Sequence, residues 1–266
     1  MQVVIDQMQR QVALPALPQK IISLVPSLTE LLYELGLSQR IVGVTKFCVH
    51  PAQARKTKTI IGGTKQFRME VIHHLYPDLI IGNKEENYRE GIESLSLHYP
   101  VWMSDITTLE DALQMILSIG NITGTEAKAF ALAENIRQKF VLLKEKTAFC
   151  SRPRVLYLIW RKPWMAAGKN TFIDDMLQWA GWQNVLALPR YPVLTEKQMT
   201  ELAPDWVFLS SEPFPFGQKH IAELRPLLPK ARFQLVEGQM FSWYGSRLLH
   251  SADYFASLQR ASRTLG

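Results

Sequence analysis

A repeated pattern constrains the fold of this chain more than any other feature. The stretch LYPDLIIG (residues 75–82) places a helix end before a Pro-Asp corner and an apolar strand, and LAPDWVFL (202–209) does the same. Each copy follows a polar helical segment, at 70–75 and at 196–202. Internal repeats of this kind indicate duplicated structural units. The chain is therefore predicted to fold as two similar lobes.

A second repeated pattern supports the same interpretation. Residues 21–36 and 154–181 each read as a strand, a loop and a helix closed by glycine, the usual residue after a helix end. Strands are predicted near 21–25, 41–44, 79–82, 101–103, 154–159, 206–210 and 232–236, and helices near 27–35, 68–75, 88–97, 109–120, 171–180, 196–202, 218–226 and 246–262. Strands that alternate with helices predict α/β lobes with mainly parallel sheets.

A long helix is predicted between the lobes. Residues 125–147 contain no glycine or proline, and their apolar side chains recur at helical spacing on one face. The preceding TGTE (123–126) has the form of a capping box. Such a connection is stiff, because flexible linkers are rich in glycine and serine. The predicted boundaries are an N-terminal extension over 1–19, a first lobe over 20–122, a backbone helix over 123–150 and a second lobe over 151–266.

Composition excludes several classes of protein. The formal net charge is +6, but lysines and arginines are scattered, so nucleic-acid binding is not predicted. No apolar run approaches the roughly 18 residues of a membrane helix. Cys48 and Cys150 lack C-x-x-C spacing and are expected to be reduced and buried. The histidines form no ligand set, since the adjacent His73 and His74 point apart on a helix, so neither a direct metal site nor a covalent cofactor is expected.

The N-terminal sequence MQVVIDQMQRQVALPALPQK does not have the form of a signal peptide. We expect a cytoplasmic protein if Met1 is the native start. A periplasmic protein is expected instead if a signal sequence lies upstream.

Catalysis is not predicted. Ser27 in VPSLT lacks both glycines of a nucleophile elbow, and Gly62-Gly63-Thr64-Lys65 lacks the G-K-[ST] order of a phosphate loop. Ser27 and Glu30 instead have capping-box spacing. Ser27 is therefore predicted to cap a helix that begins at Leu28.

Taken in order, six elements resemble the helical-backbone (class III) solute-binding proteins of ABC importers, and most of all their cobalamin-binding members. These elements, which together span about residues 20–262, are IISLVPSLTELLYELGLSQRIVGVT, HPAQARKTKTIIGG, LYPDLIIGN, the long helix after ITGTEAKA, VLYLIWRKPWMAAGKNTFIDDMLQWAGWQNV and LAPDWVFLSS. The resemblance implies two Rossmann-like lobes joined by one long rigid helix, with a small-molecule ligand held in the cleft between them.

The resemblance also implies where the ligand binds. The matching loop positions are Pro26, Ser27, Phe47, Phe67, Asn83, Lys84, Trp160, Arg161, Trp164, Trp243, Tyr244 and Arg247. Gln66-Phe67 and Asn83-Lys84 stand where cobalamin binders place tryptophans, which is a departure from that pattern.

The aromatic loops LIWRKPW and MFSWYGSR suit a planar macrocycle, because aromatic rings offer large flat apolar faces. Packing between the lobes is the alternative role for these rings. Arg161 and Arg247 can clamp a carboxylate or phosphate. The loop 211–216 is either a wall of the cleft or a packed loop.

We therefore expect a binding protein, not an enzyme, whose bulky ligand is cobalamin, another corrinoid, haem or a ferric siderophore. Any metal arrives inside the ligand. The family implies docking of Glu70 and Glu196 on an ABC permease, although Lys197 stands where the second glutamate is usual. A monomer is expected. The alternatives are a cytoplasmic carrier or sensor of such a ligand, and an enzyme that uses the same cleft.

Overall fold

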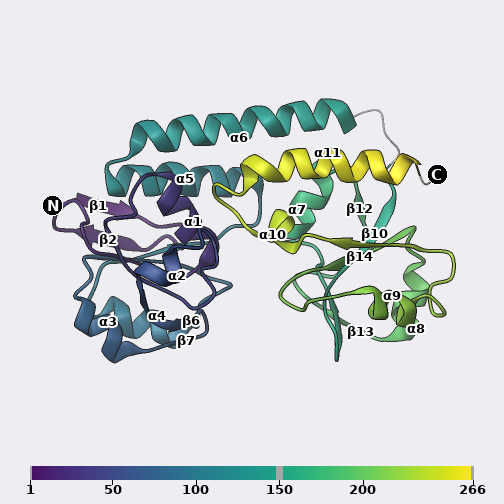
Figure 1. Ribbon diagram of the computed structural model, residues 1–266, viewed down its shortest axis with the longest axis horizontal. Coiled ribbons are helices and arrows are strands. Elements are labelled where there is room, and N and C mark those ends of the chain that lie inside the picture. Colours follow the sequence, from purple (N-terminus) through teal and green to yellow (C-terminus); the bar gives the residue numbers. More distant parts are fainter. Residues whose placement is uncertain (1, 148–151, 265–266) are drawn as a thin grey trace. The chain divides into compact units, whose positions relative to one another are not determined.

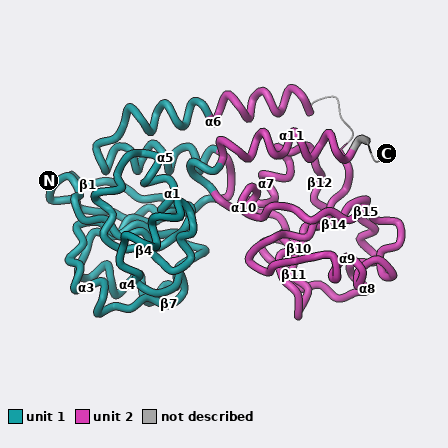
Figure 2. Tube along the Cα trace, in the orientation of Figure 1, with its two compact units in different colours: residues 1–106, 110–135, 244–247 teal, residues 107–109, 136–243, 248–266 magenta. Residues whose placement is uncertain are grey.

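The computed structural model describes residues 2–147 and 152–264, and Figure 1 shows the order of its elements. The chain divides into two compact units, coloured in Figure 2. Unit 1 comprises Met1–Ile106, Glu110–Asn135 and Tyr244–Arg247, and unit 2 comprises Thr107–Leu109, Ile136–Trp243 and Leu248–Gly266. The predicted boundary between 150 and 151 lies outside the described residues. The predicted lobe limits remain predictions.

Unit 1 is built on a parallel five-stranded sheet. Its strand order is β5 (Thr59–Ile60), β4 (Ile41–Val44), β3 (Ile21–Ser23), β8 (Leu79–Asn83) and β9 (Val101–Ser104). Its helices are α1 (Pro26–Glu34), α2 (Ala54–Thr57), α3 (Met69–Leu75), α4 (Arg89–Ser96) and α5 (Leu109–Thr123). In Figure 1, α3 and α4 lie on the side of this unit opposite α5. β3, β8 and β9 are buried along their whole length, as expected of a parallel sheet covered on both faces.

Unit 2 repeats this plan around a mixed sheet. The order is β13 (Val193–Leu194), β11 (Trp164–Ala166), β10 (Arg154–Trp160), β14 (Trp206–Ser210) and β15 (Arg232–Val236), and β12 (Gln183–Asn184) also pairs with β10. β10, β12, β14 and β15 are parallel, whereas β11 and β13 are antiparallel additions. The prediction of α/β lobes with mainly parallel sheets is confirmed.

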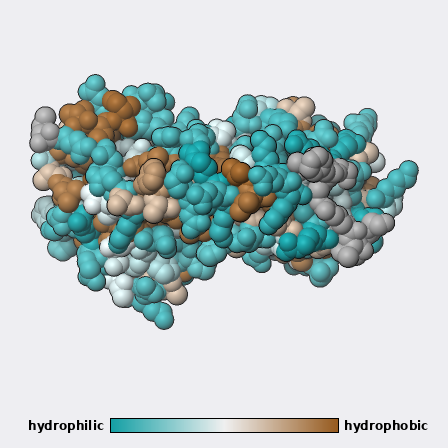
Figure 3. All heavy atoms as spheres, turned by 90° about the horizontal axis from the view of Figure 1, so that it is seen from above, coloured by the Kyte–Doolittle hydropathy of each residue, from teal (hydrophilic) through white to brown (hydrophobic). Residues whose placement is uncertain are grey.

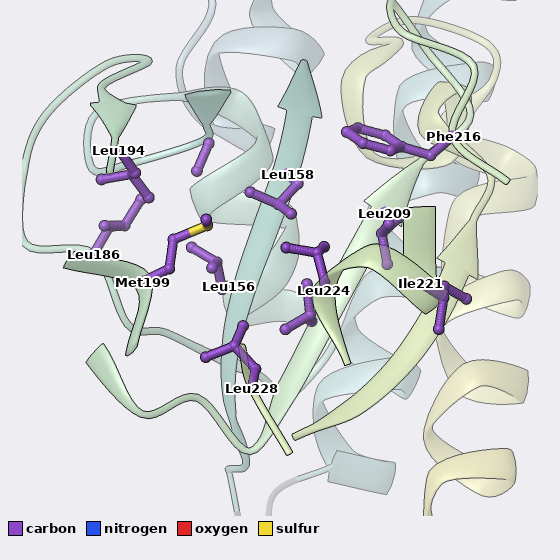
Figure 4. Packing of buried hydrophobic residues seen from close by; sticks show 12 residues of the cluster. Leu156, Leu158, Leu186, Leu194, Met199, Leu209, Phe216, Ile221, Leu224 and Leu228 are labelled. Carbon is purple, nitrogen blue, oxygen red and sulfur yellow. The ribbon is translucent and has the colours of Figure 1, made fainter. Parts of the chain in front are cut away.

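The helices of unit 2 lie on both sides of its central strands. They are α7 (Phe172–Trp179), α8 (Glu196–Leu202), α9 (Gln218–Leu224), α10 (Gly238–Ser242) and α11 (Leu248–Thr264). α8 and α9 lie on one side of β10 and β14, and α7 and α11 on the other (Figure 1). Figure 4 shows the core on the α8–α9 side, where Leu156 and Leu158 of β10 face Met199 and Leu224. Phe216 closes this core at the end to which β10 runs.

The predicted long helix is confirmed as α6 (Glu126–Thr147). Its residues up to Asn135 belong to unit 1 and those from Ile136 to unit 2. Ala129, Ile136 and Phe140 on its inner face are fully buried. The surface seen in Figure 3, on which α6 lies, is mostly hydrophilic, with hydrophobic side chains in separate patches. Within residues 2–147 and 152–264, no helix combines the length and apolar character needed to cross a membrane.

The capping box predicted at 123–126 is wrong. The Thr123 hydroxyl donates to the Ile119 carbonyl oxygen and so belongs to the last turn of α5. Gly124 follows with a left-handed φ of 67°, the conformation in which glycine commonly ends a helix. Thr123 therefore terminates one helix and does not start the next.

Several short elements were not predicted, and a hairpin at the N-terminus is the largest of them. β1 (Gln2–Ile5) and β2 (Gln11–Leu14) pair antiparallel, and the small hairpin of β6 (Gly62–Gly63) and β7 (Gln66–Phe67) was also missed. The Asp6 carboxylate accepts hydrogen bonds from the N–H groups of Met8, Arg10 and Met103. Since Met103 lies on edge strand β9, the hairpin covers an otherwise open sheet edge.

The repeated Pro-Asp corner forms the same local structure in both units. Tyr76 and Ala203 end α3 and α8 with left-handed φ values of 46° and 43°. The Asp78 N–H donates to the Lys20 carbonyl oxygen at 3.0 Å, and the Asp205 N–H to that of Arg154 at 2.9 Å. Each aspartate carboxylate also accepts from the backbone where the central strand begins. The corner therefore ties each central strand to its neighbour.

We predict that Asp78→Ala destabilises the protein more than Asp205→Ala. The Asp78 carboxylate accepts two backbone N–H bonds, from Gln19 and Lys20, each at 2.8 Å, whereas that of Asp205 accepts one from the backbone of the described residues, that of Arg154. A hydrogen bond to a charged group contributes about 1.5–3 kcal/mol, so Asp78→Ala is expected to cost at least about 2 kcal/mol in urea unfolding. Asp78→Asn, which keeps one acceptor oxygen, is the control. Equal losses for all three variants would contradict this account.

Candidate functional site

Strand order singles out one point in each sheet for ligand binding. In unit 1 the chain passes from β3 to β4 and β5 on one side, and then to β8 and β9 on the other. In unit 2 the corresponding division lies between β10 and β14. Open α/β sheets bind ligands beyond the carboxyl ends of their strands at such a switch point. The loops that follow β3, β8, β10 and β14 are therefore the candidate positions.

In unit 2 five rings gather at the end of β10, in β11, in the loop after β14 and in α9. We call them the ring cluster: Trp160, Trp164, Phe214, Phe216 and His220. Trp160 meets Phe214 edge-on with centroids 5.6 Å apart, and Trp164 stacks on Phe216 at 6.2 Å with an interplanar angle of 3°. Phe214 and Phe216 lie 4.8 Å apart. Trp160 is 39% exposed, whereas Phe216 is buried in the core (Figure 4). The ring cluster is thus anchored in the core by Phe216 and reaches solvent at Trp160.

Arg161 lies beside the ring cluster. Its guanidinium is 5.3 Å from the centroid of the Trp164 ring, within the range of a cation–π contact. Arg161 Nε donates to Glu223 Oε2 at 2.7 Å, and Nη2 donates to Oε1. Glu223 is on α9 and had not been predicted as a site residue. The two side chains remain 21% and 37% exposed.

His220 is the fifth ring of the cluster and lies edge-on to Phe214 and Phe216. Burial lowers its pKa, and the positive charges of Lys219 and Arg161 lower it further. Its Nδ1 accepts a hydrogen bond from the Gly217 N–H at 2.9 Å, so the ring proton is on Nε2. Across the described residues, no three His, Cys, Asp or Glu side chains group closely enough to hold a metal ion.

At the switch point of unit 1, the chain's own segment Tyr244–Arg247 contacts α1 and the loop after β8. The Tyr244 hydroxyl donates to Glu86 Oε1 at 3.0 Å, in the loop after β8. Burial and the negative charge of Glu86 raise the pKa of Tyr244 well above its ordinary value, although the nearby Ser27 hydroxyl opposes the rise. The Ser27 hydroxyl is buried and makes no hydrogen bond of standard geometry with the described residues. Ser27 and Tyr244, far apart in the sequence, therefore meet in one site.

The prediction that Ser27 caps its helix is wrong. α1 begins at Pro26, whose fixed φ suits the first helical position, and the cap residue Val25 offers no side-chain acceptor. Glu30 does not return a hydrogen bond to the helix start. It accepts hydrogen bonds from Arg247, at 3.1 Å from Nε and 2.5 Å from Nη2. Arg247 thus pairs inside unit 1.

Four other predicted residues of unit 1 have differing surroundings. Asn83 is buried, accepts from the N–H groups of Glu85 and Glu86 and donates to Ser104, so its amide orders the loop after β8. Lys84 is exposed and paired with Asp105. Phe67 is buried against Tyr88, with centroids 4.9 Å apart. Phe47 is 50% exposed.

Three further predicted residues are Trp243, Glu70 and Glu196. Trp243 is buried at the end of α10. Glu70 and Glu196 are exposed in the first turns of α3 and α8. Cys48 is buried and free, as predicted, whereas Cys150 lies outside the described residues. The cleft expected between the lobes stays a prediction.

We predict that Arg247→Ala lowers the free energy of unfolding by about 2 kcal/mol at neutral pH, because it leaves a partly buried carboxylate without its partner. Arg161→Ala, at a more exposed pair, should cost less than Arg247→Ala. The measurement is urea unfolding of both variants.

The loss caused by Arg247→Ala should depend on pH. Burial already raises the pKa of Glu30 in the folded protein, and Arg247 opposes that rise. Removing Arg247 raises the pKa of Glu30 in the folded protein further above its pKa in the unfolded chain. The stability of the variant therefore falls as the pH rises from the unfolded to the folded pKa of Glu30. The loss should therefore be small near pH 4 and largest at pH 7. A loss independent of pH would contradict the role assigned to Glu30.

Comparison with known proteins shows the family to which the chain is similar. A family profile described as "Periplasmic binding protein" matches residues 21–226. The vitamin B12-binding protein of Vibrio parahaemolyticus is 25% identical over 195 residues, which are 72% of this chain and 70% of that protein. The matched family region thus contains both switch points.

Two solved structures share the fold over most of the chain. A periplasmic heme-binding protein of Pseudomonas aeruginosa superposes with a TM-score of 0.80 at 25% identity and covers 91% of this chain and 92% of its own. The periplasmic vitamin B12-binding protein of Vibrio cholerae superposes with a TM-score of 0.81 at 20% identity and covers 94% and 99%.

Proposed function

The chain belongs to the periplasmic binding protein family, and from that premise we propose that it is a solute-binding protein for a bulky ring ligand. The ligand is a corrinoid such as cobalamin, or a haem-like metal chelate. The family consists of binding proteins, which supports a role without turnover. The single observation that carries the proposal is the ring cluster of unit 2.

The ring cluster has the properties of a surface for a flat ligand. Trp160 is partly exposed, and Trp164 and Phe214 are half-buried, so their faces are only partly used in packing. Phe216 holds them on the core, which keeps the surface rigid before the ligand arrives. Rigid aromatic faces bind large rings at low entropy cost. The names of the relatives, which bind vitamin B12 and heme, support this class of ligand.

We also propose that the protein delivers its ligand to an ABC-type importer. Glu70 and Glu196 are exposed and available for docking on a permease. Each lies in the first turn of the helix that precedes a Pro-Asp corner, although Lys197, and not Glu196, stands at the same distance before its corner as Glu70 does. Under this proposal the protein acts in the periplasm, as the family name implies, and the ligand binds without covalent attachment.

Binding is tested by titrating the purified protein with cobalamin, cobinamide and haem, followed by visible absorption and by the melting temperature. At least one ring ligand is expected to bind and to raise the melting temperature, since a ligand that binds only the folded state stabilises it. If none of the three changes either signal, the proposed function fails.

Trp160→Ala is expected to weaken binding of that ligand by about tenfold, as truncation of an aromatic anchor commonly does. Trp164→Ala should act similarly, and Phe47→Ala tests the exposed ring of unit 1. Phe130→Ala, which removes an exposed ring from α6, is the matched control and should bind like the unaltered protein. Equal affinity in the Trp160 and Phe130 variants would remove the ring cluster from the site.

A further inference from the structure

We infer that Glu223 is a placeholder for an oxyanion of the ligand, and that the ligand carries a carboxylate or a phosphate which displaces Glu223 from Arg161. The inference rests on the proposed function and deepens it, because it names a chemical group that the ligand must have. It also makes Glu223 a specificity-determining residue.

The geometry of Arg161 is that of a clamp already closed on a carboxylate. Nε and Nη2 engage both oxygens of Glu223, the two-pronged arrangement in which arginine holds carboxylates and phosphates. Among the described residues, Nη1 has no hydrogen-bond partner. The guanidinium lies over the Trp164 ring, so its free donor is beside the surface proposed for the ligand. An oxyanion on the rim of that ligand comes within reach of Arg161.

Exchange of Glu223 for a ligand oxyanion costs little. Glu223 is 37% exposed, so its carboxylate can turn into water and keep its hydration. Ion pairs at such positions are weak because water screens the charges, whereas a charge pair that a bound ligand covers is screened less. The hydrogen bond from Arg161 lowers the pKa of Glu223, and the nearby positive charge of Lys162, which lowers it further, also favours an arriving anion.

Arg247, the other arginine predicted to clamp an anion, does not share these properties. Its side chain is 12% exposed and its partner Glu30 is 20% exposed, inside unit 1. Withdrawal of Arg247 would leave that carboxylate partly buried and unpaired, which is costly. The structure therefore separates the two arginines, and Arg161 is the one available for exchange.

The test compares ligands that differ only in the anion. Haem carries two carboxylates and its dimethyl ester none, and cobinamide phosphate carries a phosphate that cobinamide lacks. In the unaltered protein, the anion-bearing member of the pair that binds should bind at least about tenfold more tightly than its counterpart without the anion. The haem and corrinoid arms distinguish a carboxylate from a phosphate as the group that Arg161 takes.

Two substitutions locate the effect. Glu223→Gln removes the competing charge and should tighten binding of the anionic probe by about 2- to 5-fold without changing that of the neutral probe. Arg161→Gln should abolish the preference for the anion and also the effect of Glu223→Gln. Glu201→Gln, which removes an exposed carboxylate from α8, is the matched control and should change neither affinity.

The outcomes separate the two proposals. If neither probe of either pair binds, the proposed function fails, and this inference fails with it. If probes bind but the acid and neutral forms have equal affinity, or Glu223→Gln acts like Glu201→Gln, the inference is overturned while the proposed function stands. Circular dichroism of each variant checks that the fold is intact.

Discussion

The pairing of the two central strands in each unit is the constraint on which the rest of the structure depends. Asp78 and Asp205 fix this pairing, because each binds the backbone at the start of the first strand through its own N–H and its carboxylate. With the register of β3 against β8 and of β10 against β14 set, every other parallel strand can add only on the outside. The carboxyl ends of the central pair then form the switch point. The corner at the amino ends of these strands therefore determines where the site lies at their carboxyl ends.

The two units use equivalent switch points differently. In unit 1 the segment Tyr244–Arg247 lies in the site and buries its polar groups against Ser27, Glu30 and Glu86. In unit 2 the site carries the ring cluster, whose outer member Trp160 remains partly exposed. Duplication of a fold therefore need not duplicate a binding surface. The two units differ in the side chains of the loops that follow the strands. The repeated pattern of strands and helices does not specify these loop residues.

The sequence predicted the regular elements and missed what depends on distant contacts. Helices and strands have a periodic pattern, so their limits were predicted to within a few residues, and the long helix to within one. β11 and β13 were missed because each is short and becomes a strand only through pairing with a neighbour. The Ser27 cap was predicted wrongly because local spacing matched a capping box, whereas Glu30 finds its partner in Arg247, far along the chain. The aromatic loop 211–216 was recognised, but nothing in the sequence around Glu223 indicated its pairing with Arg161.

Arg161 and Arg247 illustrate why residue type alone does not assign a role. Both follow an aromatic segment, and by sequence both are equally suited to clamp an anion. Their partners distinguish them. A guanidinium whose carboxylate is shielded from water contributes to holding the fold, because separation of the pair exposes a large desolvation cost. A guanidinium whose carboxylate can return to water is held in place at little cost and remains exchangeable. Burial of the partner, more than the arginine itself, therefore decides which of the two serves the fold and which can serve a ligand.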